Sequence, residues 1–445
     1  MKKYYKFTAL ILSIILLLSL TACASEESRK DSRQTTESTK RTATDGKKSQ
    51  SVKKDNLKLL ASKELTTGSS GTEPVTSDVD DTFQKAYKDY AFRLFSENYK
   101  VAGCTNMISP FSLFMALGML TNGASGETKD ELEALFGMPI EDINRYAASW
   151  SRQLTGSEEI SFTNANSIWL RNSFADCVEE NFLRNCADYY QASVLVSDFN
   201  DSKAVDDINK WVNYNTDGMI QKMYDNIDPM TVSILLNAIS FDGDWQIPFE
   251  DGNVSDKSFT HENGTKETKS MMEGEADSVF YENEFCTGCK KDYKGGDYSF
   301  LALLPKEGVS ISELINSLTG DSFFELTNNG RYGAVTIEIP EFTESFTADM
   351  NELLHNMGVN RAFLPGGADF SALSKEESLY VSSVLQKTYI EVNPKGTRAA
   401  AVTGIIADTE AFYEPENFWV VLDHSFVYMI VDNNGNMPVF MGVYQ

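Results

Sequence analysis

The chain has 445 residues, of which 42% are hydrophobic and 11% aromatic, which is enough to build a large buried core. Its formal net charge of −26 at pH 7 argues against nucleic acid or heparin-like polyanions as partners. The whole chain has 3 histidines, which leaves little scope for catalysis by a histidine base.

The N-terminus, residues 1–22, has the order of a secretory signal peptide: a basic start, an apolar run over residues 7–20, and small residues after it. That run is shorter than the roughly 20 residues of a membrane-spanning helix. Leu-Thr-Ala before Cys23 resembles a bacterial lipobox, which implies cleavage before Cys23 and a diacylglyceryl group on its sulfur. An ordinary signal peptide ending near a cysteine is the alternative. We expect an extracytoplasmic lipoprotein, anchored to the membrane at the bacterial cell surface.

Residues 23–79 begin with the lipidated cysteine and continue as a stretch rich in Ser, Thr and Lys, with few apolar residues. Such a composition cannot offset its ordering entropy, so it predicts a disordered polar tether. Leu57, Leu59 and Leu60 predict a transient helix at most. Residues 1–60 carry 13 Lys/Arg against 6 Asp/Glu, which leaves the rest of the chain at −33. A basic tether under an acidic body suits an anionic membrane surface.

Residues 80–445 read as one domain without a second linker. Apolar residues at spacings of three and four predict a helix over residues 83–95, and Ser109-Pro110 opens a second over residues 111–120. A third follows at residues 128–136. Strand-like segments come later, at residues 160–170, 233–241, 300–304, 334–339, 380–392, 419–422, 426–431 and 439–444. Because helices come first and strands dominate later, the predicted class is α+β with large sheets.

Enzyme motifs and metal-site spacings are missing from the sequence. No G-x-S-x-G, Walker, G-x-G-x-x-G or H-E-x-x-H motif occurs, so we expect neither an enzyme nor a cofactor. A glycosidase that uses two carboxylates would leave no such motif and stays open. Cys286-Thr-Gly-Cys289 has the spacing of a redox motif or half a zinc site, but a second ligand pair is missing. We interpret it as an incidental pair or a local disulfide, not a metal site.

The segment 395–407, KGTRAAAVTGIIA, combines a glycine, very small residues and no proline. Read at period two from Thr397 to Asp408, Thr397 and Ala399 begin a face that is small or apolar, whereas Arg398 begins the other face and both charges, Arg398 and Asp408, lie there. This alternation predicts a segment that can enter a sheet with one face against packed core. A permanent strand or a flexible connector is the alternative.

Five segments, taken in chain order, resemble the serpin family over residues 80–445. They are NMISPFS with the continuation ALGMLTNGASGETKDEL, LLNAISFDGDWQIPF, VTIEIPEF, GVNRAFLPGGADFSAL and VVLDHSFVYMI. The resemblance implies the serpin fold: N-terminal helices, three β-sheets and an exposed reactive-centre loop that can insert into the central sheet. It also implies a suicide-type inhibitor, monomeric and not an enzyme, whose partner is a target serine peptidase or, alternatively, a cysteine peptidase, held in a covalent complex. A non-inhibitory serpin used for binding or structure is the runner-up.

The resemblance also assigns roles to particular residues. It makes Trp245 the breach tryptophan and assigns to the polar shutter Ser109, Ser112, Asn237 and Gln386, the last standing where the family usually has histidine. Pro394 stands where most inhibitory members have glutamate, which removes a hinge ion pair. The hinge is Gly396, Thr397, Arg398, Ala399, Ala400, Ala401, Val402 and Thr403, with Arg398 in place of a common glutamate.

The reactive bond follows from a count within the resemblance. With Gly396 as the fifteenth residue before the cleaved bond, Glu410 precedes the bond and Ala411 follows it. A bond one to three residues away is the alternative, since the loop is longer than in many members. Glutamate would suit a glutamyl-specific peptidase, whereas elastase-, subtilisin- or chymotrypsin-like targets would be suited by Ile406, Thr409, Ala411 or Phe412.

Overall fold

The computed structural model describes residues 57–66, 76, 78–102, 106–154, 160–375, 379–397 and 416–445. The signal peptide, Cys23 and most of the predicted tether lie outside these ranges. Residues from Asn56 to Gln445 form one compact unit. Within the described ranges, no helix is both long and apolar enough to cross a membrane.

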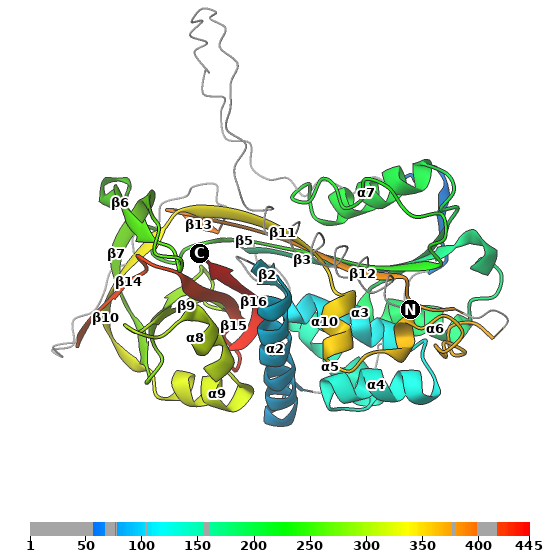
Figure 1. The fold of residues 1–445 in the computed structure, drawn as a ribbon, viewed down its shortest axis with the longest axis horizontal. Coiled ribbons are helices and arrows are strands. Elements are labelled where there is room, and N and C mark those ends of the chain that lie inside the picture. Colours follow the sequence, from blue (N-terminus) through cyan, green and yellow to red (C-terminus); the bar gives the residue numbers. More distant parts are fainter. Residues whose placement is uncertain are drawn as a thin grey trace, which may run out of the picture. The chain divides into compact units, whose positions relative to one another are not determined.

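Most helices lie on one side of the central sheet and α7 (Lys203–Asn215) lies on the other, and three helices cover the three predicted ones (Figure 1). α3 (Pro110–Thr121) is buried on all sides, and its N-terminus is capped by the Ser109 side chain, which accepts a hydrogen bond from the Ser112 N–H. The others are α2 (Asp81–Ala102), α4 (Gly126–Phe136), α5 (Ile140–Gln153), α6 (Glu180–Tyr190), α8 (Ile311–Ser317), α9 (Gly320–Asn328) and α10 (Asn351–Asn356).

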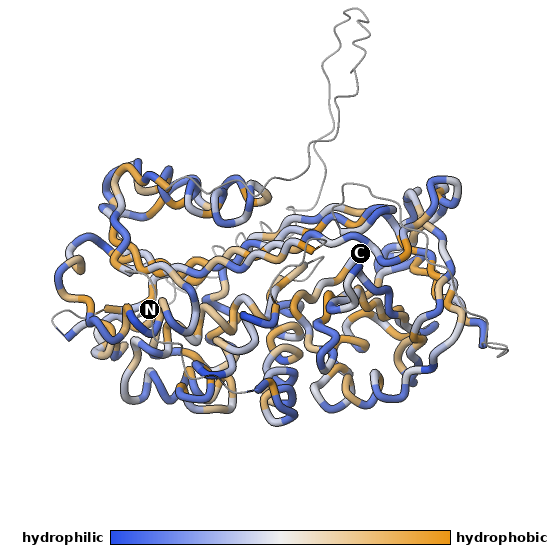
Figure 2. The backbone as a smooth tube through the Cα atoms, turned by 180° about the vertical axis from the view of Figure 1, so that it is seen from behind, coloured by the Kyte–Doolittle hydropathy of each residue, from blue (hydrophilic) through white to orange (hydrophobic). Residues whose placement is uncertain are grey.

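A seven-stranded central sheet lies between α7 on one face and α3 on the other (Figure 1). Its strand order is β1 (Ser62–Glu64), β4 (Ser193–Ser197), β3 (Ile160–Arg171), β5 (Ser233–Asp244), β13 (Gly396–Thr397), β12 (Ser383–Asn393) and β11 (Phe342–Asp349). Polar and apolar residues are mixed along its long strands (Figure 2), and along β12 buried residues alternate with partly buried ones. Strands β5 and β12 pair in parallel from Ser383 opposite Ile234 to Tyr389 opposite Ser240.

A second, nine-stranded sheet contains the C-terminal strands. Its order is β14 (Asn417–Val421), β10 (Arg331–Pro340), β7 (Lys266–Glu282), β8 (Cys286–Asp292), β9 (Tyr298–Pro305), β15 (Phe426–Asp432), β16 (Met437–Tyr444) and β2 (Asn106–Ile108), with β6 (Val254–Thr260) paired to β7. The α+β class predicted from the sequence is confirmed. The described residues form two hydrogen-bonded sheets where three were expected, because the 17-residue strand β7 runs continuously through both parts of the second sheet.

Residues 57–66 belong to the fold, so the predicted disordered tether is wrong for this segment. Strand β1 pairs antiparallel with β4 and forms the edge of the central sheet. The N–H groups of Leu60, Ala61 and Ser62 donate to the carboxylate of Asp207 at 2.7, 2.7 and 2.9 Å. Asp207 is buried on α7, and apolar side chains of the segment pack against the cluster under that helix. Composition alone missed this order because the binding groups lie far along the chain.

Candidate functional site

The residues that the sequence assigned to a hinge and its surroundings meet at one end of the central sheet. Strand β13 lies between β5 and β12: Gly396 pairs with Asp244 and Asn393, and Thr397 pairs with Gly243 and Val392. The first two predicted hinge residues are therefore already paired in the sheet. Beyond Tyr389, β12 no longer pairs with β5, and β13 occupies the space between them.

A tight turn brings β13 into this position. Strand β12 ends at Asn393, and its side-chain Oδ1 accepts hydrogen bonds from the N–H groups of Lys395 (3.0 Å) and Gly396 (3.3 Å). The Pro394 carbonyl accepts from the N–H of Phe249 at 2.8 Å. The fixed φ of proline suits this turn, and the turn does not use the backbone N–H that proline lacks.

Gly396 is required here by close approach of the backbone. A Cβ atom at this position would lie 2.2 Å from the carbonyl oxygen of Gly243 and 2.7 Å from the Cα of Asp244. Both are backbone atoms of the central strand β5, so neither can move aside cheaply. The structure thus gives the physical reason for a glycine at the hinge position.

Trp245 closes the end of the sheet next to this glycine. It is fully buried; its Nε1 donates to the Asn393 carbonyl at 3.0 Å and its N–H donates to the Lys395 carbonyl at 2.8 Å. Its ring stacks on that of Tyr293 at 4.5 Å between centroids. The Tyr293 hydroxyl lies 2.6 Å from the hydroxyl of Thr397, and burial raises the pKa of Tyr293, so it stays protonated. Thr397 is fully buried, which agrees with its predicted inward face.

Lys291 is a buried cation at the same end of the sheet. Its Nζ donates to the Ile247 carbonyl at 2.7 Å and lies 4.2 Å from the ring centre of Phe249 and 5.4 Å from that of Trp245. Burial lowers its pKa to about 8. The sequence did not single it out, because a lysine in a strand is usually a surface residue.

The four predicted shutter residues form one buried hydrogen-bond network where α3 meets β5 and β12. Gln386 accepts from the Ser109 N–H (2.8 Å) and donates both to the Ser109 carbonyl (2.9 Å) and to Asn237 Oδ1 (3.0 Å). Asn237 Nδ2 donates to the Ser112 carbonyl at 2.7 Å. Gln386 thus makes the contacts that a shutter residue needs, and the network bridges two strands that pair directly.

Comparison with known proteins identifies the family. The model of the family Serpin (serine protease inhibitor) matches residues 85–445. The chain belongs to the serpin family. Iripin-3 of Ixodes ricinus is 32% identical over 381 residues, covering 82% of this chain and 95% of the relative. Human neuroserpin is 28% identical, covering 76% of this chain and 84% of the relative.

The fold agrees with solved serpin structures. The native state of the thermophilic serpin tengpin is 36% identical, with a TM-score of 0.78, covering 86% of this chain and 99% of tengpin. Its latent state has a TM-score of 0.72. The family is one of inhibitors and not of enzymes, as the sequence predicted.

The same buried hydrogen-bond network contains two asparagines that sequence reasoning missed. Asn166 on β3 accepts from Asn237 Nδ2 at 2.6 Å, and Asn164 accepts from the Ser112 hydroxyl at 2.9 Å. The signal was present as the Thr-Asn-Ala-Asn run, which puts Asn164 and Asn166 two residues apart in a predicted strand. Polar residues at alternate positions of a buried strand indicate an internal network.

The remaining predicted site residues lie outside the described part of the chain. They are Cys23, the hinge residues Arg398, Ala399, Ala400, Ala401, Val402 and Thr403, and the reactive-bond residues Glu410 and Ala411. Cys286 and Cys289 are described as free, buried thiols, so the alternative of a local disulfide is wrong. Burial raises the pKa of each to about 12. Among the described residues, no cluster of His, Cys, Asp or Glu could hold a metal.

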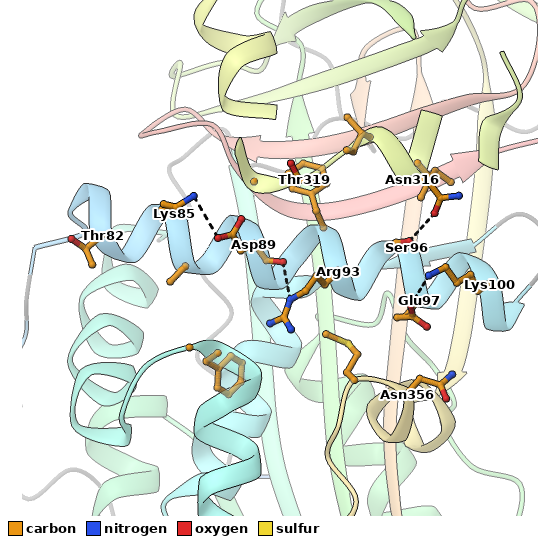
Figure 3. A pocket seen from close by; sticks show the side chains of 18 residues that line it. Thr82, Lys85, Asp89, Arg93, Ser96, Glu97, Lys100, Asn316, Thr319 and Asn356 are labelled. Carbon is orange, nitrogen blue, oxygen red and sulfur yellow. Dashed lines mark hydrogen bonds and ion pairs between the residues drawn. The ribbon is translucent and has the colours of Figure 1, made fainter. Parts of the chain in front are cut away.

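A surface hollow of about 910 Å³ lies apart from this site, between α2, α8, α9 and α10 (Figure 3). Its polar side chains largely bond to one another. Lys100 pairs with Glu97, and Ser96 donates to Asn316. The hollow therefore offers few free polar groups to a ligand.

Proposed function

We propose that this serpin is a suicide-type inhibitor of extracellular serine peptidases that works by inserting its cleaved loop into the central sheet. The observation that carries the proposal is the position of β13 in the central sheet. The start of the predicted hinge already lies between β5 and β12, at the point where the inserted strand must begin. Further insertion would continue the same antiparallel pairing and would separate β5 from β12 down to Ile234 and Ser383.

The chemistry of trapping is that of an interrupted hydrolysis. The serine Oγ of the peptidase attacks the carbonyl carbon of Glu410, the bond to the nitrogen of Ala411 breaks, and the proton from the serine passes to the new amine. The serpin remains as an ester on the peptidase. Insertion of the loop then drags the peptidase across the molecule and distorts its active site before water can cleave the ester.

Insertion supplies enough free energy for this work. A new central strand makes about ten backbone hydrogen bonds at roughly 1 kcal/mol net each, so it contributes on the order of 10 kcal/mol. The uninserted protein would then be a kinetically trapped state. A relative solved in both native and latent states supports this metastability.

The test is to incubate the purified domain with chymotrypsin, elastase, subtilisin and a glutamyl endopeptidase and to look for an SDS-resistant complex. We expect a complex with at least one of them. Mass spectrometry should find a released fragment that begins at Ala411. Clean cleavage by every peptidase without a complex would instead support the non-inhibitory role, which Pro394 in the hinge leaves open.

We further propose that the protein is a bacterial lipoprotein, anchored outside the cytoplasm through Cys23. The support is the lipobox-like sequence and the basic segment behind it. A lipidated cysteine with two or more acyl chains anchors stably, whereas basic residues alone bind weakly and are released by salt. Cys23→Ala should release the protein from the membrane fraction without harming inhibition. Retention of that variant at high salt would contradict the lipobox interpretation.

A further inference from the structure

The outer face of three strands next to the loop carries an acidic and aromatic surface. Strands β7, β10 and β14 lie side by side, in a register that forms three rows across the sheet. The rows are Asp277–Ala334–Asn417, Glu275–Thr336–Trp419 and Glu273–Glu338–Val421. We call these nine residues, with Tyr332 at the end of β10, the β14 face.

The two sides of these strands differ sharply. The inner side chains Val335, Ile337 and Val420 are buried in the core. On the β14 face, the three carboxylates of β7 are exposed. Trp419 is 65% exposed and Tyr332 is 70% exposed. Ala334 and Glu338 are buried within the face, but its β7 carboxylates and its two aromatic side chains stay exposed, although large aromatic side chains are usually covered.

The exposed aromatics point to a protein partner. Trp and Tyr are enriched in the energetic centres of protein interfaces and depleted from the free surface. Within the described sheet, β14 is an edge strand, a place where proteins usually avoid large exposed apolar side chains. A tryptophan held there is best explained by contact with a second molecule.

The position of β14 limits what that molecule can be. Asn417 follows Glu410 by seven residues, which reach at most about 25 Å when fully extended. A peptidase domain of about 220 residues has a radius of gyration of about 17 Å. A peptidase bound at the reactive bond therefore cannot avoid the neighbourhood of the β14 face.

The charge of the face selects the kind of peptidase surface. Four carboxylates lie on it, and Lys257 pairs with two of them, Glu273 at 3.1 Å and Glu338 at 2.6 Å. The face therefore keeps a net negative charge, concentrated at Glu275 and Asp277. Such a surface attracts a positively charged partner and speeds its association.

We propose that the β14 face is an accessory docking surface for a positively charged patch of the target peptidase. The proposal rests on the proposed inhibitory function, since only a peptidase bound to the loop is brought to this face. The carboxylates accelerate the encounter, and Trp419 packs against the peptidase body. The face sets which peptidase is captured fastest, while the reactive bond sets which one can cleave.

The test measures second-order association rate constants with each panel peptidase that forms a complex with the unaltered chain. Each peptidase is used as purified and with its surface lysines succinylated, which reverses their charge. The variant is E275K/D277K. The matched control is D130K/E352K, which makes the same charge change at two exposed positions on α4 and α10.

For the peptidase that the unaltered chain captures fastest, E275K/D277K should lower the rate constant at least tenfold at low ionic strength and flatten its salt dependence. The control should change it less than twofold, and succinylation of the peptidase should remove the difference. Trp419→Ala should lower the rate constant without altering the salt dependence. The stoichiometry of complex formation should stay unchanged throughout.

Three results would overturn the proposal. Equal rate constants for E275K/D277K and the control would overturn it alone and leave the inhibitory function standing. Failure of the unaltered chain to form any complex would overturn the proposed function and this surface with it. A concentration-dependent dimer that Trp419→Ala dissociates would assign the face to a second copy of the chain.

Discussion

Replacing Gln386 with methionine tests the shutter most sharply. Gln386 is 1% exposed and makes hydrogen bonds with Ser109 N, Ser109 O and Asn237 Oδ1. Methionine has a similar length and fills the same space, but it can neither donate nor accept effectively. Gln386→Met therefore removes the polar contacts with little change in packing.

The size of the effect follows from these three hydrogen bonds. At about 1 kcal/mol each, the free energy of unfolding should fall by about 3 kcal/mol. The bond to Asn237 joins β5 to β12, which a fully inserted strand would move about 9.5 Å apart, so this bond exists only in the closed sheet. Conversion to the inserted form should speed up about fivefold if only this bond is relieved on opening, and about 150-fold if all three are.

The assay follows loop insertion during incubation at elevated temperature, by gel electrophoresis through a urea gradient. Inserted protein resists unfolding and migrates differently from the native form. Gln153→Met is the control, because Gln153 is exposed at the end of α5. If Gln386→Met converts no faster than Gln153→Met, the network does not hold the sheet closed and the assignment of the shutter is refuted.

Three further changes address other parts of the structure. Gly396→Ala should displace the hinge from the sheet and shift the protein from inhibitor to substrate, as measured by the ratio of complex to cleaved serpin. The control Gly252→Ala should leave this ratio unchanged, because a Cβ atom there would meet no atom within 4 Å. Asp207→Ala should lower the free energy of unfolding by about 3 kcal/mol, since three N–H groups lose a charged acceptor. It should also expose residues 57–66 to trypsin, and unchanged cleavage there would contradict the role given to this carboxylate. Burial raises the pKa of Glu344 to about 7 from 4.5, so between these pH values the folded state binds more protons than the unfolded state. The free energy of unfolding should therefore fall by about 3 kcal/mol as pH rises from 4.5 to 7. Glu344→Gln should remove this fall, as measured by urea unfolding at pH 5 and pH 8.

Much of the helical layer and of the shutter could be predicted from the sequence because the signals are local. Ser109 and Pro110 mark the start of α3 through a cap and a fixed φ, and the continuous apolar run marks its burial. Strands β5 and β15 were found because their residues are strongly apolar, whereas β12 alternates buried and partly buried residues. The family resemblance then assigned Asn237 and Gln386 to the same network, and the structure shows a hydrogen bond between their side chains.

The features that were missed depend on partners distant in the chain. Strand β7 is rich in Lys, Glu and Ser, and much of it is exposed, so it lacks the apolar alternation of a predicted strand. Order in residues 57–66 depends on Asp207, and the position of the hinge depends on the close approach to Gly243. No local pattern reports such contacts, which form only when the chain is folded.

The central claim is that β5 and β12 must separate to admit the loop, and a reversible lock on these strands tests it most directly. Ala238 and Lys387 are register partners in this parallel pair, and neighbouring strands are close enough for a disulfide between A238C and K387C. With the disulfide formed, a peptidase that the unaltered chain traps should cleave the loop and leave without a complex. Reduction should restore the SDS-resistant complex in the same sample. Equal amounts of complex in the oxidised and reduced protein would contradict the mechanism.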